Sequence, residues 1–273
     1  MYAALEAKRA QQSAAPLARV RTVEDRSALA NVRAIGSAWT RAAFDGAFYE
    51  TPPDGGSSLG VVFVRSRGGD TATRNPAALG GGTVDEHLIY EGLSRVAADA
   101  VVAGAGTLHA DALFTVWHPE LVDLRRSLRL PRHPAQVVMS ADGSVRPDEL
   151  LLFNLPDVPV FVLTSASGRE RLAPFLAPRP WVAAVVRSSL PEQFACLRDA
   201  GIRRACSVGG RRSATELVDA NLVNDVYLTT TQADGAEPGT PWYVGRRRLE
   251  MRTVAIKEWH GEHGLVCFEH GAL

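Results

Sequence analysis

The sequence predicts an α/β fold in which a mixed, mostly parallel sheet is flanked by helices on both faces. Two observations predict it. Between residues 59 and 231, short apolar runs alternate with helical stretches, which is typical of parallel strands joined by crossovers. At the C-terminal end, two strand-like runs meet at a Gly-containing turn, 260–264, which indicates an antiparallel hairpin. The expected architecture is therefore a three-layer α/β/α domain.

The elements follow from apolar runs and their periodicity. Strands are predicted where β-branched residues cluster, at 59–65, 100–104, 135–140, 159–164, 181–186, 204–210 and 225–231. Helices are predicted at 84–99, 168–176, 190–200 and 213–223. Thr83 and Glu86 have the spacing of a capping box before the first of these helices.

The N-terminal part differs in composition from the rest. Residues 1–45 are Ala-rich and helix-forming, and no turn signal occurs before Asp45-Gly46. The stretch 51–58 is rich in Pro, Gly and Ser and indicates a boundary. We therefore expect a helical N-terminal extension, residues 1–50, followed by one main domain, residues 51–273.

Bulk composition bounds the possible partners. Thirty basic residues balance thirty acidic ones, so no electrostatic argument favours nucleic acid or an anionic membrane. No apolar run is long enough to span a bilayer, and the N-terminus lacks the apolar core of a secretory signal. Three cysteines without metal-like spacing predict reduced thiols and a cytoplasmic location. The seven histidines form no metal-binding motif, so no metal site is predicted.

A first glycine loop follows the strand 100–104. Gly104 and Gly106 resemble half of a dinucleotide fingerprint, but His109 stands where the third glycine is required. The loop is either a tight strand-exit turn or a phosphate or ribose contact made by its amides and the Thr107 hydroxyl. His109 and Asp111 lie just beyond it, where strand ends face ligands, although Asp111 could equally cap the next turn.

A second glycine loop lies about a hundred residues later. Gly209-Gly210 ends a strand, and Arg211 and Arg212 open the following helix. A helix N-terminus attracts anions, and arginines pair with phosphate oxygens. The alternative is a sharp turn with solvated arginines.

Together, two segments resemble a known family. "ADAVVAGAGTLHADA" resembles "ADAVLVGAGTVRADDP" of the reductase domain in riboflavin-biosynthesis deaminase/reductases, the RibD C-terminal family. "VGGRRSATELVDANLVNDVYLTTT" is similar to "EGGPRLLxxLLxAGLVDELxLxxxP" of the same domain. The resemblance covers residues 59–268. It implies a dihydrofolate-reductase-like fold, NADPH as hydride donor and a homodimer.

Carried over by position, the resemblance implies two sets of binding residues. The implied cofactor contacts are Val64, Gly104, Gly106, Thr107, Asp111, Ser140, Gly209, Gly210, Arg211 and Arg212. The substrate contacts expected by position are Ser66, Arg67, Trp117, His118 and Val208.

The substrate side departs from the family pattern. The family's "SLDGK" reads Ser66-Arg67-Gly68-Gly69-Asp70 here, and a strand lysine is replaced by Val62. The glutamate of "EGG" is replaced by Val208, and a substrate-binding arginine falls at or near Trp117. Apolar replacements of groups that pair with a polar substrate weaken its binding. The cofactor side is therefore kept while the substrate side is altered.

These observations predict an NADPH-dependent reductase acting on a small molecule. The family's reaction transfers hydride to C1 of 5-amino-6-(5-phosphoribosylamino)uracil, and Asp111 and His109 are the candidate catalytic residues. Three alternatives stay open. The chain reduces another heterocyclic, pterin-like substrate; it binds NADPH without turnover; or its Gly-Gly loop holds a different phosphorylated ligand.

Overall fold

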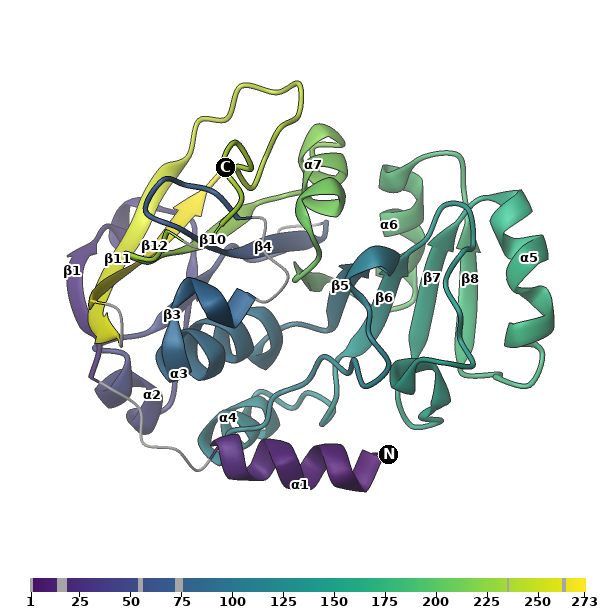
Figure 1. Ribbon diagram of the computed structural model, residues 1–273, viewed down its shortest axis with the longest axis horizontal. Helices are drawn as coiled ribbons and strands as arrows, with labels where there is room; N and C mark the ends of the chain where they lie inside the picture. Colours follow the sequence, from purple (N-terminus) through teal and green to yellow (C-terminus); the bar gives the residue numbers. More distant parts are fainter. Residues whose placement is uncertain (1, 14–18, 54–55, 72–75, 235, 262–263) are drawn as a thin grey trace.

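The computed structural model describes residues 2–13, 19–53, 56–71, 76–234, 236–261 and 264–273. Its main feature is a ten-stranded sheet in the order β1-β11-β12-β10-β4-β9-β5-β6-β7-β8 (Figure 1). A second, two-stranded sheet pairs β2 with β3. The three-layer, mostly parallel α/β fold predicted from the sequence is confirmed.

Seven neighbouring strands of the main sheet are parallel. They are β4 (Ser58–Arg65), β5 (Ala100–Gly104), β6 (Ala135–Met139), β7 (Val160–Thr164), β8 (Val182–Val186), β9 (Arg204–Ser207) and β10 (Asp225–Thr230). All seven therefore end at the same edge of the sheet, where loops commonly form ligand sites in such folds.

The antiparallel part continues from β10. The strands β11 (Arg252–Gly261) and β12 (Gly264–Ala272) form the predicted C-terminal hairpin, and β12 pairs with β10. Residues 262–263 of the predicted turn lie outside the described residues. The edge strand β1 (Arg21–Asp25) pairs with β11.

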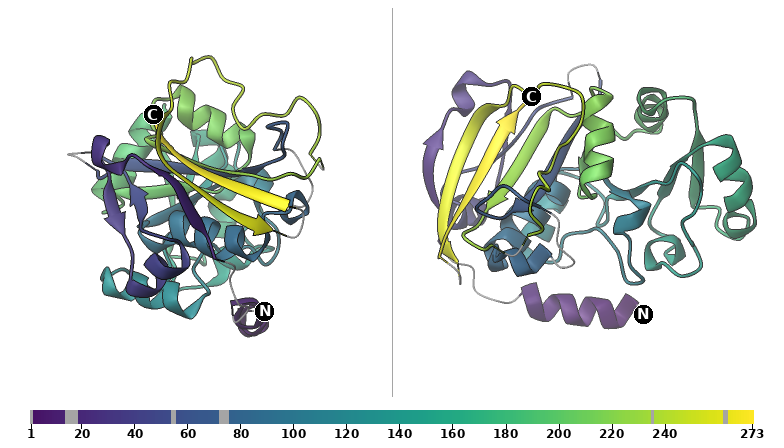
Figure 2. Two further views of the ribbon diagram at one scale, coloured as in Figure 1. Left: turned by 90° about the vertical axis from the view of Figure 1, so that its left-hand side faces the viewer. Right: turned by 45° about the horizontal axis from the view of Figure 1, so that its top comes forward.

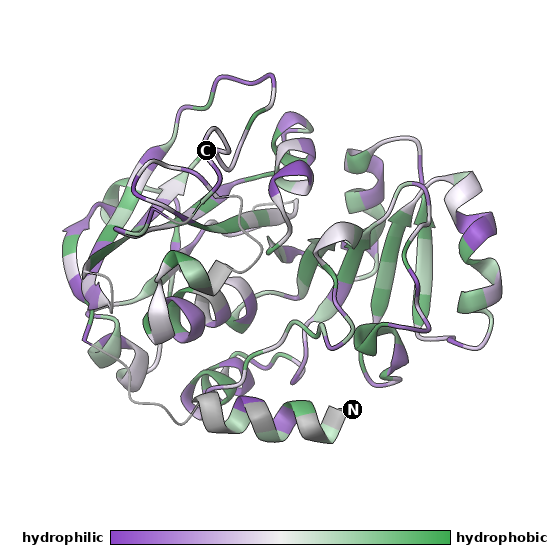
Figure 3. Cartoon of the chain, viewed as in Figure 1, coloured by the Kyte–Doolittle hydropathy of each residue, from purple (hydrophilic) through white to green (hydrophobic). Residues whose placement is uncertain are grey.

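Helices cover both faces of the sheet. On one face, α6 (Leu190–Asp199) and α7 (Arg211–Asp219) pack Phe194 and Leu217 against Val61 and Val102. On the other face lie α3 (Gly82–Val84), its continuation η3 (Asp85–Val96), α4 (Pro119–Ser127) and α5 (Ala166–Leu176). The parallel strands are apolar on both sides, as expected when crossover helices bury both faces (Figure 3).

Short elements complete the chain. They are α1 (Tyr2–Ser13), η1 (Ser27–Leu29), β2 (Arg33–Ile35), α2 (Ala38–Ala43), β3 (Phe48–Glu50), η2 (Pro76–Leu79), η4 (Ala105–Thr107) and η5 (Leu151–Asn154). Helix α1 lies on the same side of the molecule as α4 (Figures 1 and 2), and its Leu5 is buried in the apolar cluster that also contains Leu113 and Trp117.

The helical expectation for residues 1–45 is right for α1 and α2 and wrong for residues 19–37, the described segment between them. Residues 21–25 form β1, because pairing with β11 satisfies their backbone groups. Lys257 of β11 anchors this region: its buried Nζ donates to Thr22 Oγ1 at 2.7 Å and to the Asp45 carbonyl at 3.0 Å. Tertiary pairing has outweighed local helix propensity here.

The expected capping box at Thr83 and Glu86 is also wrong. The helix begins two residues earlier than predicted, at Gly82, with Gly81 at its N-cap and no side-chain capping bond. Glu86 instead pairs with Arg9 of α1 at 3.0 Å. The flexible Gly80–Gly82 backbone allows the earlier start, since Gly82 has φ of +65°.

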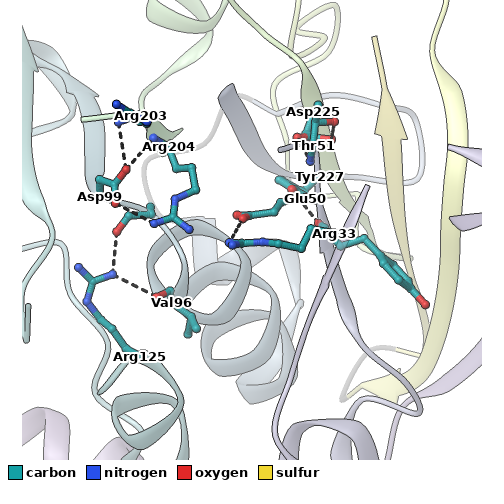
Figure 4. Close-up of polar contacts among 12 residues, drawn as sticks. Arg33, Glu50, Thr51, Val96, Asp99, Arg125, Arg203, Arg204, Asp225 and Tyr227 are labelled. Carbon is teal, nitrogen blue, oxygen red and sulfur yellow. Dashed lines mark hydrogen bonds and ion pairs between the residues drawn. The ribbon is translucent and has the colours of Figure 1, made fainter. Parts of the chain in front are cut away.

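A network of charged groups joins the elements at the amino ends of the parallel strands (Figure 4). Asp99 accepts from the Arg203 and Arg204 amides, and Glu50 pairs with Arg33. Arg125 is buried, and its guanidinium donates to four carbonyls, those of Arg95, Val96, Ala98 and Pro131. This edge is therefore closed by internal pairing, whereas the carboxyl edge is open.

Candidate cofactor site

A pocket of about 770 Å³ opens at the carboxyl ends of the parallel strands. The loops after β5, β6, β7 and β8 line it, together with the first turns of α6 and α7. This is the position at which open parallel sheets bind ligands.

The two glycine loops predicted from the sequence meet at this pocket. The Gly210 amide donates to Thr107 Oγ1 at 3.1 Å, which joins the loop after β5 to the loop after β9. A Cβ on Gly104 would lie 2.3 Å from Ser213 Oγ, and a Cβ on Gly209 would lie 3.1 Å from the Gly104 nitrogen. The two loops approach this closely because both positions are glycine.

Helix α7 presents its N-terminus to the pocket. Gly210 is its N-cap and supplies no side-chain capping bond, whereas Ser165 caps α5 and Ser189 caps α6. Of the three helices that begin beside the pocket in the described chain, α7 alone leaves its first-turn amides without a side-chain cap. Arg211 and Arg212 stand at this turn, so the site combines a helix dipole with cationic side chains.

Ser140 supplies a second polar group. It follows β6, lines the pocket and is only 4% exposed. Its Oγ has no hydrogen-bond partner among the described residues. A buried hydroxyl without a partner is costly, so this oxygen is available to a ligand in the pocket.

Arg187 was not singled out from the sequence. It follows β8 and lines the pocket with Ser188 and Ser189. The sequence did contain one signal for Arg187. It directly follows a strand, as Ser140 does, and that strand is parallel to the one that ends at Gly104. That β8 and β5 border the same pocket follows from the strand order, which local sequence does not reveal.

The structure therefore brings most of the predicted cofactor residues together. Gly104, Gly106, Thr107, Ser140, Gly210, Arg211 and Arg212 line the pocket. Gly209 lies directly behind it, against Gly104. Arg212 pairs along its own helix with Glu216 at 3.1 Å, and its side chain is 93% exposed.

Asp111 and His109 form a separate exposed pair. His109 Nδ1 and Asp111 Oδ1 are 2.6 Å apart in the loop that follows η4. Neither residue is among those that line the pocket. Their catalytic role stays a prediction.

Four of the predicted substrate residues lie in two other places. Ser66 and Arg67 follow β4, where Ser66 Oγ accepts from the Asp70 amide at 3.3 Å and Arg67 is exposed. Trp117 is buried before α4, and its amide donates to Glu91 at 3.0 Å. His118 stacks on Trp39 with ring centroids 4.6 Å apart, and burial lowers its pKa.

Val208, the remaining predicted substrate residue, is buried. It packs with Val101, Ala103 and Phe114 in a small apolar cluster next to the sheet. The position therefore offers an apolar surface where the family motif has a carboxylate.

Asp85, which the sequence reasoning passed over, lies beside β10 and β4. Its Oδ1 accepts from Thr229 Oγ1 at 2.5 Å. Burial raises the pKa of Asp85 to about 6, although the Thr229 bond lowers it and the charge of Glu86 raises it further. The available signal was the glycine triplet 80–82, since a Cβ on Gly81 would lie 2.7 Å from Asp85 Cβ.

Comparison with known proteins identifies the family. The model of the RibD C-terminal domain matches residues 77–231, more than half of the chain. This chain belongs to the RibD C-terminal domain family. The matched region begins just before α3 and ends after β10, so it contains both glycine loops and Asp85.

Solved structures support the fold. The chain is similar to a pyrimidine reductase-like protein from Corynebacterium diphtheriae, with 16% identity and a TM-score of 0.63 over 81% of this chain and 94% of that one. It is similar to RibD from Acinetobacter baumannii, with 11% identity and a TM-score of 0.58 over 79% of this chain.

A third similar structure is the diaminohydroxyphosphoribosylaminopyrimidine deaminase/5-amino-6-(5-phosphoribosylamino)uracil reductase from Thermotoga maritima. It is 16% identical, with a TM-score of 0.57 over 80% of this chain. The match spans 57% of that protein and 57% of the Acinetobacter protein. No curated protein matches significantly. The chain thus has the fold of the riboflavin-pathway reductases.

No helix among the described residues is both long and apolar enough to cross a membrane. Within the same residues, no group of three or more His, Cys, Asp or Glu side chains could hold a metal ion.

Proposed function

We propose that this protein is an NADPH-dependent reductase that delivers hydride to a carbon of a small heterocyclic or ribosylamine substrate. The observation that carries the proposal is the pocket at the carboxyl edge, where two glycine loops distant in sequence are joined by the Gly210–Thr107 hydrogen bond. Membership of the RibD C-terminal family supports the reductase chemistry.

The residues of the pocket fit a dinucleotide phosphate. The uncapped first turn of α7 and Arg211 would hold the pyrophosphate, since backbone amides and guanidinium groups both favour phosphate oxygens. Ser140 Oγ would form a hydrogen bond, as donor or acceptor, with the adenosine part of the cofactor. Arg187 would pair with a phosphate on the ribose. When bound, NADPH supplies the hydride, and the protein supplies orientation and exclusion of water.

The substrate we infer is the pyrimidine ribosylamine of riboflavin synthesis or a related heterocycle. Val208 and Trp117 are buried, and they replace the carboxylate and the guanidinium of the family pattern. An apolar surface there favours a less polar substrate than the phosphoribosylamine. We further expect a cytoplasmic homodimer, with Asp111 and His109 near the substrate.

Calorimetry with NADPH and NADH tests the proposal. Wild-type protein is expected to bind NADPH in the micromolar range, and Arg211→Ala is expected to weaken binding at least tenfold. Arg198→Ala, an exposed arginine at the end of α6, is the matched control and should bind like the wild type. If neither nucleotide binds, the reductase proposal is refuted. NADPH binding without oxidation by any pyrimidine or pterin substrate would identify a silent NADPH-binding protein instead.

A further inference from the structure

Gln193 of α6 lines the pocket with a side chain that is almost completely buried, since the residue is only 7% exposed. Its Nε2 donates to the carbonyl of Thr164, the last residue of β7, at 3.1 Å. The same nitrogen donates to the carbonyl of Val185, one residue before the end of β8, at 3.4 Å. The amide therefore bridges the carboxyl ends of two neighbouring strands.

These two bonds fix the orientation of the Gln193 amide. Both partners are backbone carbonyl oxygens, which only accept hydrogen bonds, so the amide nitrogen must face them and the amide oxygen points away from them. Turning the amide over would set its oxygen against two carbonyl oxygens. Both hydrogens of Nε2 are used, and no described residue donates to Oε1. Gln193 thus offers the pocket one fixed acceptor and no free donor.

The turn that precedes α6 is held by its own hydrogen bonds. Ser189 is the N-cap, and its Oγ accepts from the Glu192 amide at 3.4 Å. The Glu192 carboxylate accepts in return from the Ser189 amide at 3.2 Å and from the Ser188 amide at 3.1 Å. A capping box of this kind fixes the entry of the chain into the helix. The position of Gln193 is therefore set by this turn as well as by its own two bonds.

Apolar side chains line the same part of the pocket. They come from the end of β6, from β7 and from the first residue of α6, and they are Met139, Leu163 and Leu190. The strands β7 and β8 lie two and three places from β5 in the sheet, about 10 to 15 Å at the usual strand spacing. The first turn of α7, where we place the pyrophosphate, lies against β5. One nucleoside can span the distance from that turn to Gln193, and the apolar side chains suit a flat base.

We propose that this part of the pocket binds adenine, and that Gln193 Oε1 selects the base by accepting a hydrogen bond from its 6-amino group. The inference rests on the proposed function, because the base is that of the NADPH adenosine. The 6-amino group is the donor that adenine carries, whereas its ring nitrogens are acceptors. Guanine and hypoxanthine have an oxygen at the same position, and that oxygen would meet Oε1 as acceptor against acceptor. Gln193 therefore favours adenine nucleotides over 6-oxopurine nucleotides.

The first test compares two cofactors on the wild-type protein by calorimetry. Reduced nicotinamide hypoxanthine dinucleotide phosphate (deamino-NADPH) has an oxygen in place of the 6-amino group of NADPH. A site that leaves a buried polar group unpaired loses about 5- to 150-fold in affinity, so NADPH should bind more tightly than deamino-NADPH by a factor in this range. Equal affinity for the two cofactors would overturn the role of Gln193 and leave the proposed function standing.

ATP and ITP supply the same comparison without the nicotinamide. If NADPH and NADH both fail to bind and ATP binds more tightly than ITP, the adenine site stands while the proposed function fails. If NADPH and NADH fail to bind and ATP and ITP bind equally, or do not bind, both proposals are overturned. The failure of the inference and the failure of the proposed function are therefore distinguishable.

The second test changes the acceptor. Gln193→Met removes it, so the affinity for NADPH should fall to that for deamino-NADPH. Gln193→Lys keeps donors for the two strand carbonyls and offers no acceptor, so this variant should bind deamino-NADPH at least as tightly as NADPH. A folded Gln193→Met protein that still prefers NADPH by the wild-type factor would overturn the assignment of selectivity to Gln193.

Gln136→Met is the matched control. Gln136 is also buried, and its Nε2 also donates to two carbonyls, those of Phe114 and Pro134, but it does not line the pocket. This variant should keep the wild-type preference for NADPH. Thermal unfolding without nucleotide verifies that each variant is folded. If Gln193→Met does not fold, the comparison of cofactors on the wild-type protein decides the question.

Discussion

Replacing Gly104 by Ala should weaken NADPH binding through a defined steric clash. The added methyl would lie 2.3 Å from Ser213 Oγ, more than 1 Å inside ordinary van der Waals contact. Gly104 has φ of −75° and ψ of 147°, a conformation that any residue adopts, so backbone strain contributes nothing. Overpacking of this kind costs about 1–3 kcal/mol. If the first turn of α7 shifts to relieve the clash, NADPH affinity falls by roughly 5- to 150-fold.

A double-mutant cycle isolates this clash. Calorimetric NADPH binding would be measured for wild type, Gly104→Ala, Ser213→Ala and the double variant. Because Ser213→Ala removes the clashing oxygen, the double variant should bind more tightly than Gly104→Ala, with a coupling energy of about 1 kcal/mol or more. Gly56→Ala, away from the pocket, is the control, since no atom lies within 4 Å of its added Cβ. Equal affinity for wild type and Gly104→Ala would refute the idea that close approach of the loops builds the site.

Three further predictions concern other parts of the molecule. Arg125→Met should lower the free energy of unfolding, measured in urea, by at least about 3 kcal/mol, because four buried carbonyls lose their hydrogen-bond donor. The control Arg126→Met, at the surface, should change the free energy of unfolding by less than about 0.5 kcal/mol. Burial raises the pKa of Glu50 to about 7, so the folded state holds a proton that the unfolded state releases between pH 4.5 and 7. The free energy of unfolding should therefore fall across that range, by about 3 kcal/mol, and Glu50→Gln should lack the decline in urea titrations at pH 4.5 and 8. Arg187→Ala should weaken NADPH at least tenfold in calorimetry and leave NADH unchanged, and equal losses for both would place Arg187 away from the ribose phosphate.

Much of the fold could be predicted because the central strands carry a strong local signal. The apolar runs that form β5, β6, β7, β9 and β10 are almost entirely buried, so each is nearly continuous in the sequence. Strand β1 carries no such signal. Its residues alternate between exposed and half-buried, and it exists because β11 offers an unpaired edge more than 200 residues away in sequence. Interactions over that distance are invisible to local pattern.

The candidate site likewise contains some residues that local sequence identifies and others that only the folded arrangement reveals. Glycine loops are detectable because a turn at a strand end restricts residue type, so Gly104 and Gly210 could be singled out. Arg187 could not be singled out, because an arginine after a strand is common. Its importance depends on the strand order, which places β8 beside the same pocket. Asp85 was passed over because a carboxylate in the first turn of a helix is usual on dipole grounds alone. Its burial against Thr229, 144 residues later, is a property of the folded sheet.

The two faces of the sheet differ in packing: two loops approach closely on one face, and an apolar cluster lies on the other. This difference explains which positions match the family pattern. On the α7 face, the two loops meet within hydrogen-bonding distance, and a Cβ would crowd the facing loop at both positions, 2.3 Å from Ser213 Oγ at Gly104 and 3.1 Å from the Gly104 nitrogen at Gly209. On the η3 face, Val208 packs into an apolar cluster and the polar group beside the strand ends is Asp85. Val208 therefore stands where the family motif has a carboxylate, and an apolar replacement of this kind weakens pairing with a polar substrate. We therefore expect kcat/KM to be higher for a compact heterocycle such as a dihydropterin than for 5-amino-6-(5-phosphoribosylamino)uracil, and measuring kcat/KM for both substrates tests this.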